Sequence, residues 1–283
     1  RPPGAKAVGA SSALPSLTDE ILEFYNEQVP LRRGVGLAFL VLLSLLLLRF
    51  WGHSWALSPQ LSEPQIMMRG RTKEGNPMII DDYRESYFWL KDHTPQDARV
   101  MSWWDYGYQI NGVGNRTTIA DGNTWNHEHI ALLGKCLVSA ENASWPITRH
   151  LADYVLIWTG RYIGMYSDDL AKSPHMARIA GSVYPDINPN EFYMNRDAKQ
   201  SPSKMMKESL LWRLHHHRFH ELDPPLTHFE EVFTSKNKMV RIYKVLGVSR
   251  KSKEWRVANG PGYPPELKQI IAASTPFKQI HGF

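Results

Sequence analysis

An uncharged and largely apolar run extends from Gly34 to Leu48. Six leucines place apolar side chains on every face of a helix built from this run: Leu42, Leu43, Leu45, Leu46, Leu47 and Leu48. Because a helix that is apolar all round has no side for solvent, the pattern favours a membrane span over a buried core helix. A span needs about 20 residues. The flanking Phe50, Trp51 and Trp55 suit the membrane interface and extend the predicted transmembrane helix to residues 34–55.

Residues 1–33 are predicted to form a linker that carries one short amphipathic helix. Residues 1–15 are rich in Pro, Gly, Ala and Ser, which is typical of a flexible lead-in. Ser16 and Asp19 have the spacing of a capping box, with the hydroxyl at the N-cap and the acid at N3. Apolar residues then recur at helical spacing until Pro30, which is expected to end the helix.

The basic residues around the apolar run indicate its orientation. Arg32 and Arg33 lie immediately before it, and basic residues favour the cytosolic side of a membrane. Arg49, at the other end, weakens this bias. Residues 1–33 are therefore expected in the cytosol, and residues 56–283 on the opposite side of the membrane.

Beyond a linker over residues 52–80, short apolar segments alternate with helical patterns. Strands are expected at Arg99–Trp103, Thr117–Ala120, Asp153–Trp158 and Met239–Val245. Helices are expected from Tyr83 to Asp92, capped by Asp82, and after Asn126. This alternation predicts a mixed α/β (α+β) soluble domain. Residues 153–158 are apolar on both faces, which is typical of a central strand.

Two Ser-Pro pairs predict further helix starts. Ser173 and Ser201 are each followed by proline, with Ser suited to the N-cap and Pro to the first helical position. From Gly247 onwards the sequence is basic and rich in Pro and Gly, which predicts a partly mobile C-terminal tail.

Composition excludes some classes of function. The chain has 283 residues, 33 basic and 28 acidic, with a formal net charge of +5. No block of Lys and Arg indicates a nucleic-acid partner. Cys136 is the single cysteine and cannot form an intramolecular disulfide. A chain that starts at Arg1 without a signal-peptide pattern is expected to be a segment or a processed product of something longer.

Two adjacent tryptophans and an acid follow the first predicted strand, in the segment Trp103-Trp104-Asp105-Tyr106-Gly107. An indole N–H is only a donor, a carboxylate is only an acceptor, and a hydroxyl offers one donor and two acceptor lone pairs. Two indoles and one carboxylate can therefore saturate one hydroxyl. The alternative is two core tryptophans with Asp105 capping the next turn. From the pattern alone this alternative is favoured, because adjacent residues cannot share one face of a strand or helix.

The pentapeptide resembles the signature of the catalytic subunit of oligosaccharyltransferase, which transfers a lipid-linked oligosaccharide to asparagine in Asn-X-Ser/Thr. Four other segments are similar to the same family: residues 81–90, 115–121, 123–126 and 240–245. The resemblance covers roughly residues 34–246. It implies that Trp103, Trp104 and Asp105 recognise the Ser or Thr of an acceptor sequon, with Tyr106 and Gly107 supporting them.

A second segment, Asp169-x-x-Lys172-x-x-x-Met176, resembles the family's Asp-x-x-Lys-x-x-x-Met motif. Asp169 and Lys172 have the spacing to pair across one helical turn. Pro174 is expected to reset the chain and place Met176 in the first turn of the next helix. The resemblance implies that Met176 touches the methyl group of a sequon threonine. The alternative is an exposed ion pair beside a core methionine.

The resemblance also implies a donor side and a metal. Trp125, Asn126 and His129 correspond to a family region near the pyrophosphate of the donor, a dolichol-linked oligosaccharide. Catalytic acids and the ligands of Mg²⁺ or Mn²⁺ are expected in upstream loops between membrane helices. No Asp-x-Asp motif occurs in this sequence. This chain is therefore expected to hold no metal and to act with an upstream multi-span portion, and possible further partners are other oligosaccharyltransferase subunits.

For a eukaryotic protein, these inferences imply the endoplasmic reticulum membrane, with residues 56–283 in the lumen as the acceptor-binding domain. Asn115 and Asn142 begin acceptor sequons themselves and are candidate glycosylation sites, Asn142 being the better one. Two other classes stay open. A glycan-binding module would stack sugars on the clustered tryptophans, and a structural membrane-anchored module would bury them.

Overall fold

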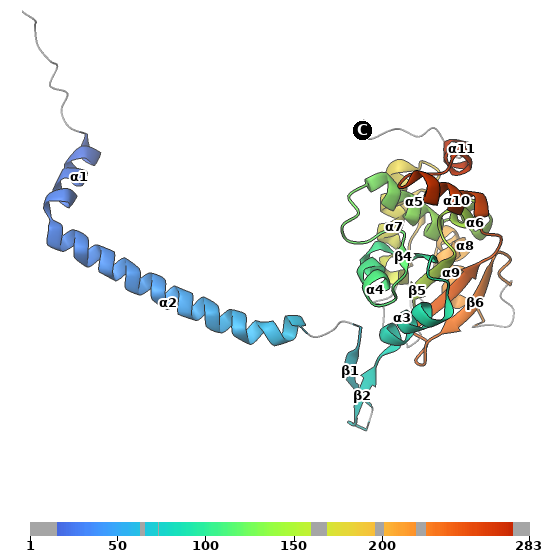
Figure 1. Ribbon diagram of the computed structural model, residues 1–283, viewed down its shortest axis with the longest axis horizontal. Coiled ribbons are helices and arrows are strands. Elements are labelled where there is room, and N and C mark those ends of the chain that lie inside the picture. The colour runs from blue at the N-terminus through green and yellow to red at the C-terminus, as the bar shows by residue number, and fades with distance from the viewer. Residues whose placement is uncertain are drawn as a thin grey trace, which may run out of the picture. The chain divides into compact units, whose positions relative to one another are not determined.

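The chain divides into two units, residues 1–64 and residues 65–283 (Figure 1). The computed structural model describes residues 16–62, 66–72, 74–159, 169–195, 201–218 and 225–273. The predicted flexible lead-in over residues 1–15 lies outside these ranges.

The first unit consists of two helices, α1 (Leu17–Glu27) and α2 (Val29–Ser62). The predicted capping box is confirmed: the Ser16 hydroxyl accepts from the Asp19 N–H at 3.3 Å, and the Asp19 carboxylate accepts from the Ser16 N–H at 3.1 Å. Pro30 does not end α1. It lies in the first turn of α2, where a backbone N–H has no acceptor within the helix, so proline costs no hydrogen bond there.

The α2 helix is longer than the span predicted at residues 34–55. It has 34 residues and a window of mean hydropathy 2.2, so its length and composition are sufficient to cross a membrane. The predicted linker over residues 52–80 is partly wrong, because α2 continues to Ser62. Later in that range β1 (Met68–Arg71) and β2 (Pro77–Ile80) form an antiparallel hairpin.

The second unit is built on a mixed sheet of five strands in the order β4-β3-β5-β7-β6. These strands are β3 (Arg99–Met101), β4 (Thr117–Thr118), β5 (Tyr154–Trp158), β6 (Phe229–Thr234) and β7 (Val240–Val245). β3 runs parallel to β4 and β5, whereas β7 runs antiparallel to β5 and β6. The mixed α/β class and the central place of β5 are thereby confirmed. β6 was not predicted, because its two adjacent glutamates interrupt the apolar pattern.

Helices surround this sheet. They are α3 (Asp82–His93), α4 (Gly107–Gly112), α5 (His127–Val138), α6 (Glu141–Leu151), α7 (Asp169–Val183), α8 (Lys204–Glu208), α9 (Leu210–His216), α10 (Arg250–Asn259) and α11 (Pro265–Ala273), with short 3₁₀ turns η1 (Trp104–Tyr106) and η2 (Pro189–Glu191). α5 and α7 approach closely at Gly134, where an added Cβ would lie 2.9 Å from the carbonyl oxygen of Met176.

The tail prediction is wrong for residues 250–273, since α10 and α11 form there and contact α6.

The predicted cap of α3 is wrong. Asp82 lies inside α3, where it is buried. Its carboxylate accepts hydrogen bonds from the Ser235 hydroxyl at 2.5 Å and the Asn237 backbone N–H at 2.8 Å, in the turn between β6 and β7. Asp82 therefore does not cap α3, because its carboxylate satisfies hydrogen-bond donors of the turn between β6 and β7.

The predicted helix start at Ser173 is also wrong, because α7 runs without interruption from Asp169 to Val183. Pro174 cannot donate to the carbonyl four residues earlier, that of Leu170. The Ser173 hydroxyl donates to this carbonyl instead, at 2.6 Å. The helix therefore continues through proline with the freed acceptor satisfied.

The second Ser-Pro pair does not start a helix either. α8 begins at Lys204, with Ser203 as the N-cap and its hydroxyl accepting from the Met206 N–H. Pro202 instead pairs with Met194 in an isolated bridge. A serine caps this helix as predicted, but it is Ser203, two residues after the predicted Ser201.

Candidate functional site

The signature segment follows the C-terminal end of β3. Trp103 is extended, η1 turns the chain over Trp104–Tyr106, and α4 starts at Gly107. An added Cβ on Gly107 would lie 2.3 Å from the Ala120 carbonyl oxygen and 2.5 Å from the Asp121 Cβ. Only glycine allows this approach, which fixes the signature against the segment that follows β4.

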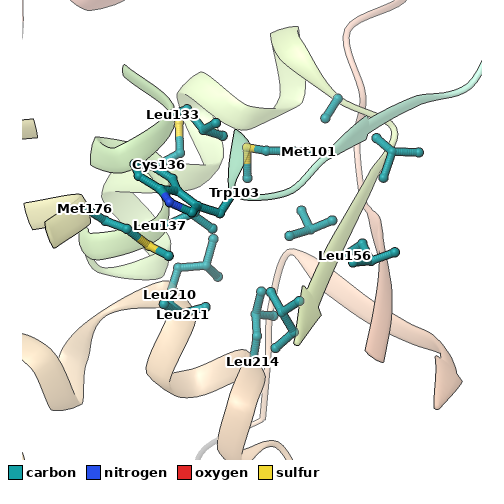
Figure 2. Packing of buried hydrophobic residues seen from close by; sticks show 14 of the residues in the cluster. Met101, Trp103, Leu133, Cys136, Leu137, Leu156, Met176, Leu210, Leu211 and Leu214 are labelled. Carbon is teal, nitrogen blue, oxygen red and sulfur yellow. The ribbon is translucent and has the colours of Figure 1, made fainter. Parts of the chain in front are cut away.

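The two tryptophans of the signature have different environments. Trp103 is 2% exposed and lies in the core beside Cys136, Leu137 and Met176 (Figure 2). Trp104 is half-buried. Their ring centroids are 6.3 Å apart and the planes are tilted by 53°, so the two rings do not form one flat surface.

Met176 is completely buried in α7. Its side chain is directed toward Trp103 within the core (Figure 2). The methionine thus supports the first indole of the signature from the interior of the domain.

Lys172 is the charged partner of the signature acid. Its Nζ lies 2.6 Å from Asp105 Oδ2 and donates to the Tyr106 hydroxyl at 2.6 Å. The predicted pairing with Asp169 across one turn is wrong, since the structure pairs Lys172 with Asp105 instead. Helical spacing permits the local pair, but the Tyr106 hydroxyl lies between the two motif residues.

Asp169 faces the interior and bonds to the signature and the central strand. Oδ1 accepts from the Tyr106 hydroxyl at 2.7 Å, and Oδ2 accepts from the Trp158 backbone N–H at 2.9 Å. Burial raises the pKa of the Asp169 carboxyl to about 7, and the hydrogen bonds from Tyr106 and Trp158 act in the opposite direction.

The donors and acceptors around Tyr106 fix one direction for this chain of bonds. An ammonium only donates, so Lys172 donates to the Tyr106 oxygen, and the Tyr106 proton is given to Asp169. Burial is the main cause that raises the pKa of Tyr106 above its ordinary value. Tyr106 therefore stays a neutral hydroxyl that joins the two motifs.

Asp105 has one oxygen bound and one open. Oδ2 is held by Lys172, whereas Oδ1 is buried and has no hydrogen-bond partner within the part of the chain that the structure describes. An unsatisfied buried acceptor costs about 1–3 kcal/mol. Asp105 Oδ1 is the one carboxylate oxygen among five buried side-chain atoms that lack a partner in the described part of the chain, and a donor from outside the chain would satisfy it.

The donor-side candidates lie at the start of α5. Asn126 caps this helix by accepting from the His129 backbone N–H at 3.0 Å. The His129 ring is bonded to the Tyr263 hydroxyl at 2.6 Å and the Ile119 carbonyl at 2.8 Å, and burial lowers its pKa. Trp125 is 94% exposed. Asn126 and His129 therefore hold the loop together, and Trp125 is the candidate with a free ring face.

No group of three or more His, Cys, Asp or Glu side chains that could hold a metal occurs within the described ranges. The two candidate glycosylation sites have exposed asparagines: Asn142 in the first turn of α6, and Asn115 in a turn with φ of +48°. The hydroxyl residue of the Asn142 sequon, Ser144, is fully buried. Glycosylation of either asparagine stays a prediction.

Trp158 is the site residue that sequence reasoning missed. It is the last residue of β5, which runs parallel to β3, so both strands end at the same edge of the sheet. A tryptophan at the end of a buried apolar strand, beside the strand that leads into the signature, is the signal that could have identified it.

The model of the STT3/PglB/AglB core domain matches residues 96–250, which is more than half of the chain and includes both the signature and the segment from Asp169 to Met176. The chain belongs to the STT3/PglB/AglB family.

Curated relatives agree with this assignment. The dolichyl-diphosphooligosaccharide–protein glycosyltransferase subunit STT3B of Oryza sativa subsp. japonica is 38% identical over 245 residues, which are 78% of this chain and 34% of that protein. The subunit STT3 of Saccharomyces cerevisiae is 35% identical over 270 residues, 84% of this chain and 37% of that protein. The chain thus spans about a third of the length of these relatives.

One solved structure of similar architecture is the C-terminal globular domain of an oligosaccharyltransferase from Archaeoglobus fulgidus. It is 18% identical, with a TM-score of 0.41, over 59% of this chain and 99% of that one. A likeness at this level adds nothing to the family assignment.

Proposed function

We propose that this chain is the C-terminal, acceptor-binding part of an oligosaccharyltransferase catalytic subunit. In this proposal it recognises the Ser or Thr of an Asn-X-Ser/Thr sequon and holds the asparagine for transfer of a lipid-linked oligosaccharide. Membership of the STT3/PglB/AglB family supports the reaction class. The geometry around Asp105 supports recognition of the sequon hydroxyl as the role of this chain in that reaction.

The observation that carries the proposal is the state of the Asp105 carboxylate. Lys172 holds Oδ2 at 2.6 Å, and Oδ1 is a buried acceptor without a partner in the described chain. A hydroxyl that donates to Oδ1 removes the cost of this unsatisfied oxygen. A ligand without a hydroxyl leaves the cost in place, so the site selects for Ser or Thr.

The indoles complete recognition of the hydroxyl. Trp104 is half-buried next to Asp105 and supplies the more accessible N–H donor. Trp103 is assigned the second donor, and its ring is fixed by core contacts that include Met176. Because Met176 is completely buried, its contact with a threonine methyl requires Trp103 to shift when the peptide binds.

The rest of the reaction is assigned to residues outside this chain. The chain spans about a third of its relatives, so the proposed catalytic acids and the ligands of Mg²⁺ or Mn²⁺ belong to an upstream multi-span portion. That ion, when bound there, neutralises the leaving pyrophosphate of the dolichol-linked donor. This chain supplies position, since a held asparagine amide meets the donor at a far higher effective concentration than a free one.

The location follows the same proposal. The α2 helix is long and apolar enough to cross a membrane. With Arg32 and Arg33 on its cytosolic side, residues 65–283 lie in the lumen of the endoplasmic reticulum, where acceptor polypeptides emerge.

The other function classes have less support. Stacking on a sugar needs an open ring face, and the Trp103 ring is covered by the core. A structural module would bury its whole signature, whereas Trp104 and Asp105 are only half-buried.

The experiment that tests the proposal is transfer to a fluorescent sequon peptide by the assembled oligosaccharyltransferase that contains this chain. We expect Asp105→Ala to lower kcat/KM by at least about a hundredfold, because the variant loses the acceptor for the sequon hydroxyl. Asp97→Ala is the matched control. It also removes a carboxylate paired with a partly exposed lysine, Lys253 at 2.7 Å, and should retain activity. Full transfer by Asp105→Ala would refute the proposal.

A further inference from the structure

The Lys172 ammonium that holds Asp105 is itself enclosed by aromatic rings. It lies 4.5 Å from the ring centroid of Tyr106 and 5.5 Å from that of Trp158. Both distances are within the range of cation–π attraction, in which the negative face of a ring favours a nearby cation. Two rings and two oxygens therefore define the position of this one side chain.

Trp158 is the middle ring of a stack of three. It stacks on Tyr106 with centroids 4.1 Å apart and planes 21° apart, and on Tyr83 at 3.7 Å and 18°. The stack draws its members from three elements: α3 supplies Tyr83, β5 supplies Trp158, and η1 supplies Tyr106. Such pairs contribute about 0.5–1.5 kcal/mol beyond the apolar area that they bury.

The backbone of Trp158 belongs to the same assembly. Its N–H donates to Asp169, the carboxylate that accepts from Tyr106. One residue at the end of the central strand thus fixes Tyr106 in two ways, through its ring face and through Asp169.

From these contacts we propose that Trp158 is a positioning residue for acceptor recognition, with Tyr83 as its support. It touches no substrate. Its ring holds the Lys172 ammonium and the Tyr106 ring, which together hold Asp105 in the rotamer that presents Oδ1 to the sequon hydroxyl. The inference rests on the proposed function and names a residue outside both sequence motifs that sets the geometry of the site.

The test compares Trp158→Leu, which removes the ring face, with Trp158→Phe, which keeps a smaller one. In the assembled enzyme we expect Trp158→Leu to raise the KM for a sequon peptide by about threefold to thirtyfold, with kcat at saturation within about twofold of wild type. Trp158→Phe should restore most of the loss. A fall in kcat with unchanged KM would contradict a positioning role.

A matched control separates positioning from packing. Trp89 of α3 is also a half-buried stacked tryptophan, with ring centroids 5.2 Å from His93 and 5.3 Å from Phe233. Trp89→Leu should destabilise the domain without changing the KM for the peptide. An equal rise in KM for both leucine variants would show that the effect of Trp158 is general packing and would overturn the inference.

A double-variant comparison tests the route through Lys172. In a Lys172→Met background, Trp158→Leu should raise the KM by a smaller factor than it does in wild type, because one of the two groups that the ring holds is already gone. Independent, multiplicative effects would contradict the inference. If Asp105→Ala raises the KM but Trp158→Leu does not, only this inference fails. If Asp105→Ala leaves the KM unchanged, the proposed function fails as well.

Discussion

Lys172 donates to Asp105 at 2.6 Å across 67 positions of sequence, and this bond joins the two motifs of the site. Asp105 follows the end of β3, whereas Lys172 lies in the first turn of α7. The same ammonium donates to the Tyr106 hydroxyl, so a single lysine orders two consecutive residues of the signature. The recognition that we propose for Asp105 therefore depends on a contact that neither motif contains alone.

Replacement of Lys172 tests this contact. Lys172→Met keeps the length of the side chain but removes the charge, so Asp105 loses its partner and both of its oxygens are left to find other donors. We expect the KM for a sequon peptide to rise by about tenfold or more, since a hydrogen bond to a charged group contributes about 1.5–3 kcal/mol. Lys172→Arg should retain part of the affinity. A methionine variant with wild-type KM would remove Lys172 from the site.

The raised pKa of Asp169 predicts a dependence on pH. Both carboxylate oxygens accept hydrogen bonds, so a proton on either one displaces Tyr106 or the Trp158 N–H. Because the pKa of Asp169 is about 7, affinity for acceptor peptide should fall as the pH is lowered through neutrality. Asp169→Asn is neutral at every pH and should abolish this titration while lowering affinity throughout. A binding profile with the same midpoint in Asp169→Asn would assign the titration to another group.

Stability should change in the opposite sense. Burial makes the folded state bind the Asp169 proton more tightly than the unfolded state, whose carboxyl has the ordinary value of 3.8. Between about pH 4 and pH 7 the folded state holds a proton that the unfolded state has released, so the free energy of unfolding should decrease as the pH rises across this window. Denaturant unfolding of wild type and Asp169→Asn at both ends of the window measures this. If the free energy of unfolding changes with pH equally in wild type and Asp169→Asn, Asp169 does not contribute to this dependence.

Met176 provides a prediction on stability and specificity. Met176→Ala should lower the free energy of unfolding by about 2–5 kcal/mol, because it opens a cavity behind Trp103. If Met176 also meets the threonine methyl, this variant should impair transfer to Asn-X-Thr more than transfer to Asn-X-Ser. Equal losses for the two peptides would restrict Met176 to the support of Trp103.

Gly107 should tolerate no side chain. A Cβ at this position would lie within 2.3 Å of the Ala120 carbonyl oxygen, which is backbone and cannot rotate away. Gly107→Ala should therefore displace η1 and reduce both thermal stability and acceptor affinity. Gly112→Ala is the control, since nothing lies within 4 Å of its added Cβ. Similar behaviour of the two variants would contradict the close approach.

The sequence predicted those features that depend on local pattern. The capping box at Ser16, the helix after Asn126 and the apolar central strand β5 all follow from neighbouring residues, and all three are present. The signature residues were identified by resemblance, because their pattern alone favoured a core interpretation. The buried Trp103 shows that this interpretation described one indole correctly.

Long-range contacts decided the features that the sequence did not predict. Lys172 has a carboxylate three residues away, yet it pairs with Asp105, and the Tyr106 hydroxyl and the Trp158 backbone N–H each bind one oxygen of Asp169. Pro174 is a helix-breaking signal only when the freed carbonyl has no donor, and Ser173 supplies one. Such outcomes depend on which side chains meet in three dimensions, and periodicity does not contain that information.

The most direct test of the account combines a change in the enzyme with a change in the peptide. Affinity is measured for a peptide with threonine in the third sequon position and for one with valine, which keeps the shape but lacks the hydroxyl, in wild type and in Asp105→Ala. We predict that wild type prefers threonine by about tenfold to a hundredfold, as expected for a buried acceptor that loses its donor, and that Asp105→Ala loses most of this preference. An unchanged preference for threonine in Asp105→Ala would contradict the claim that Asp105 recognises the hydroxyl.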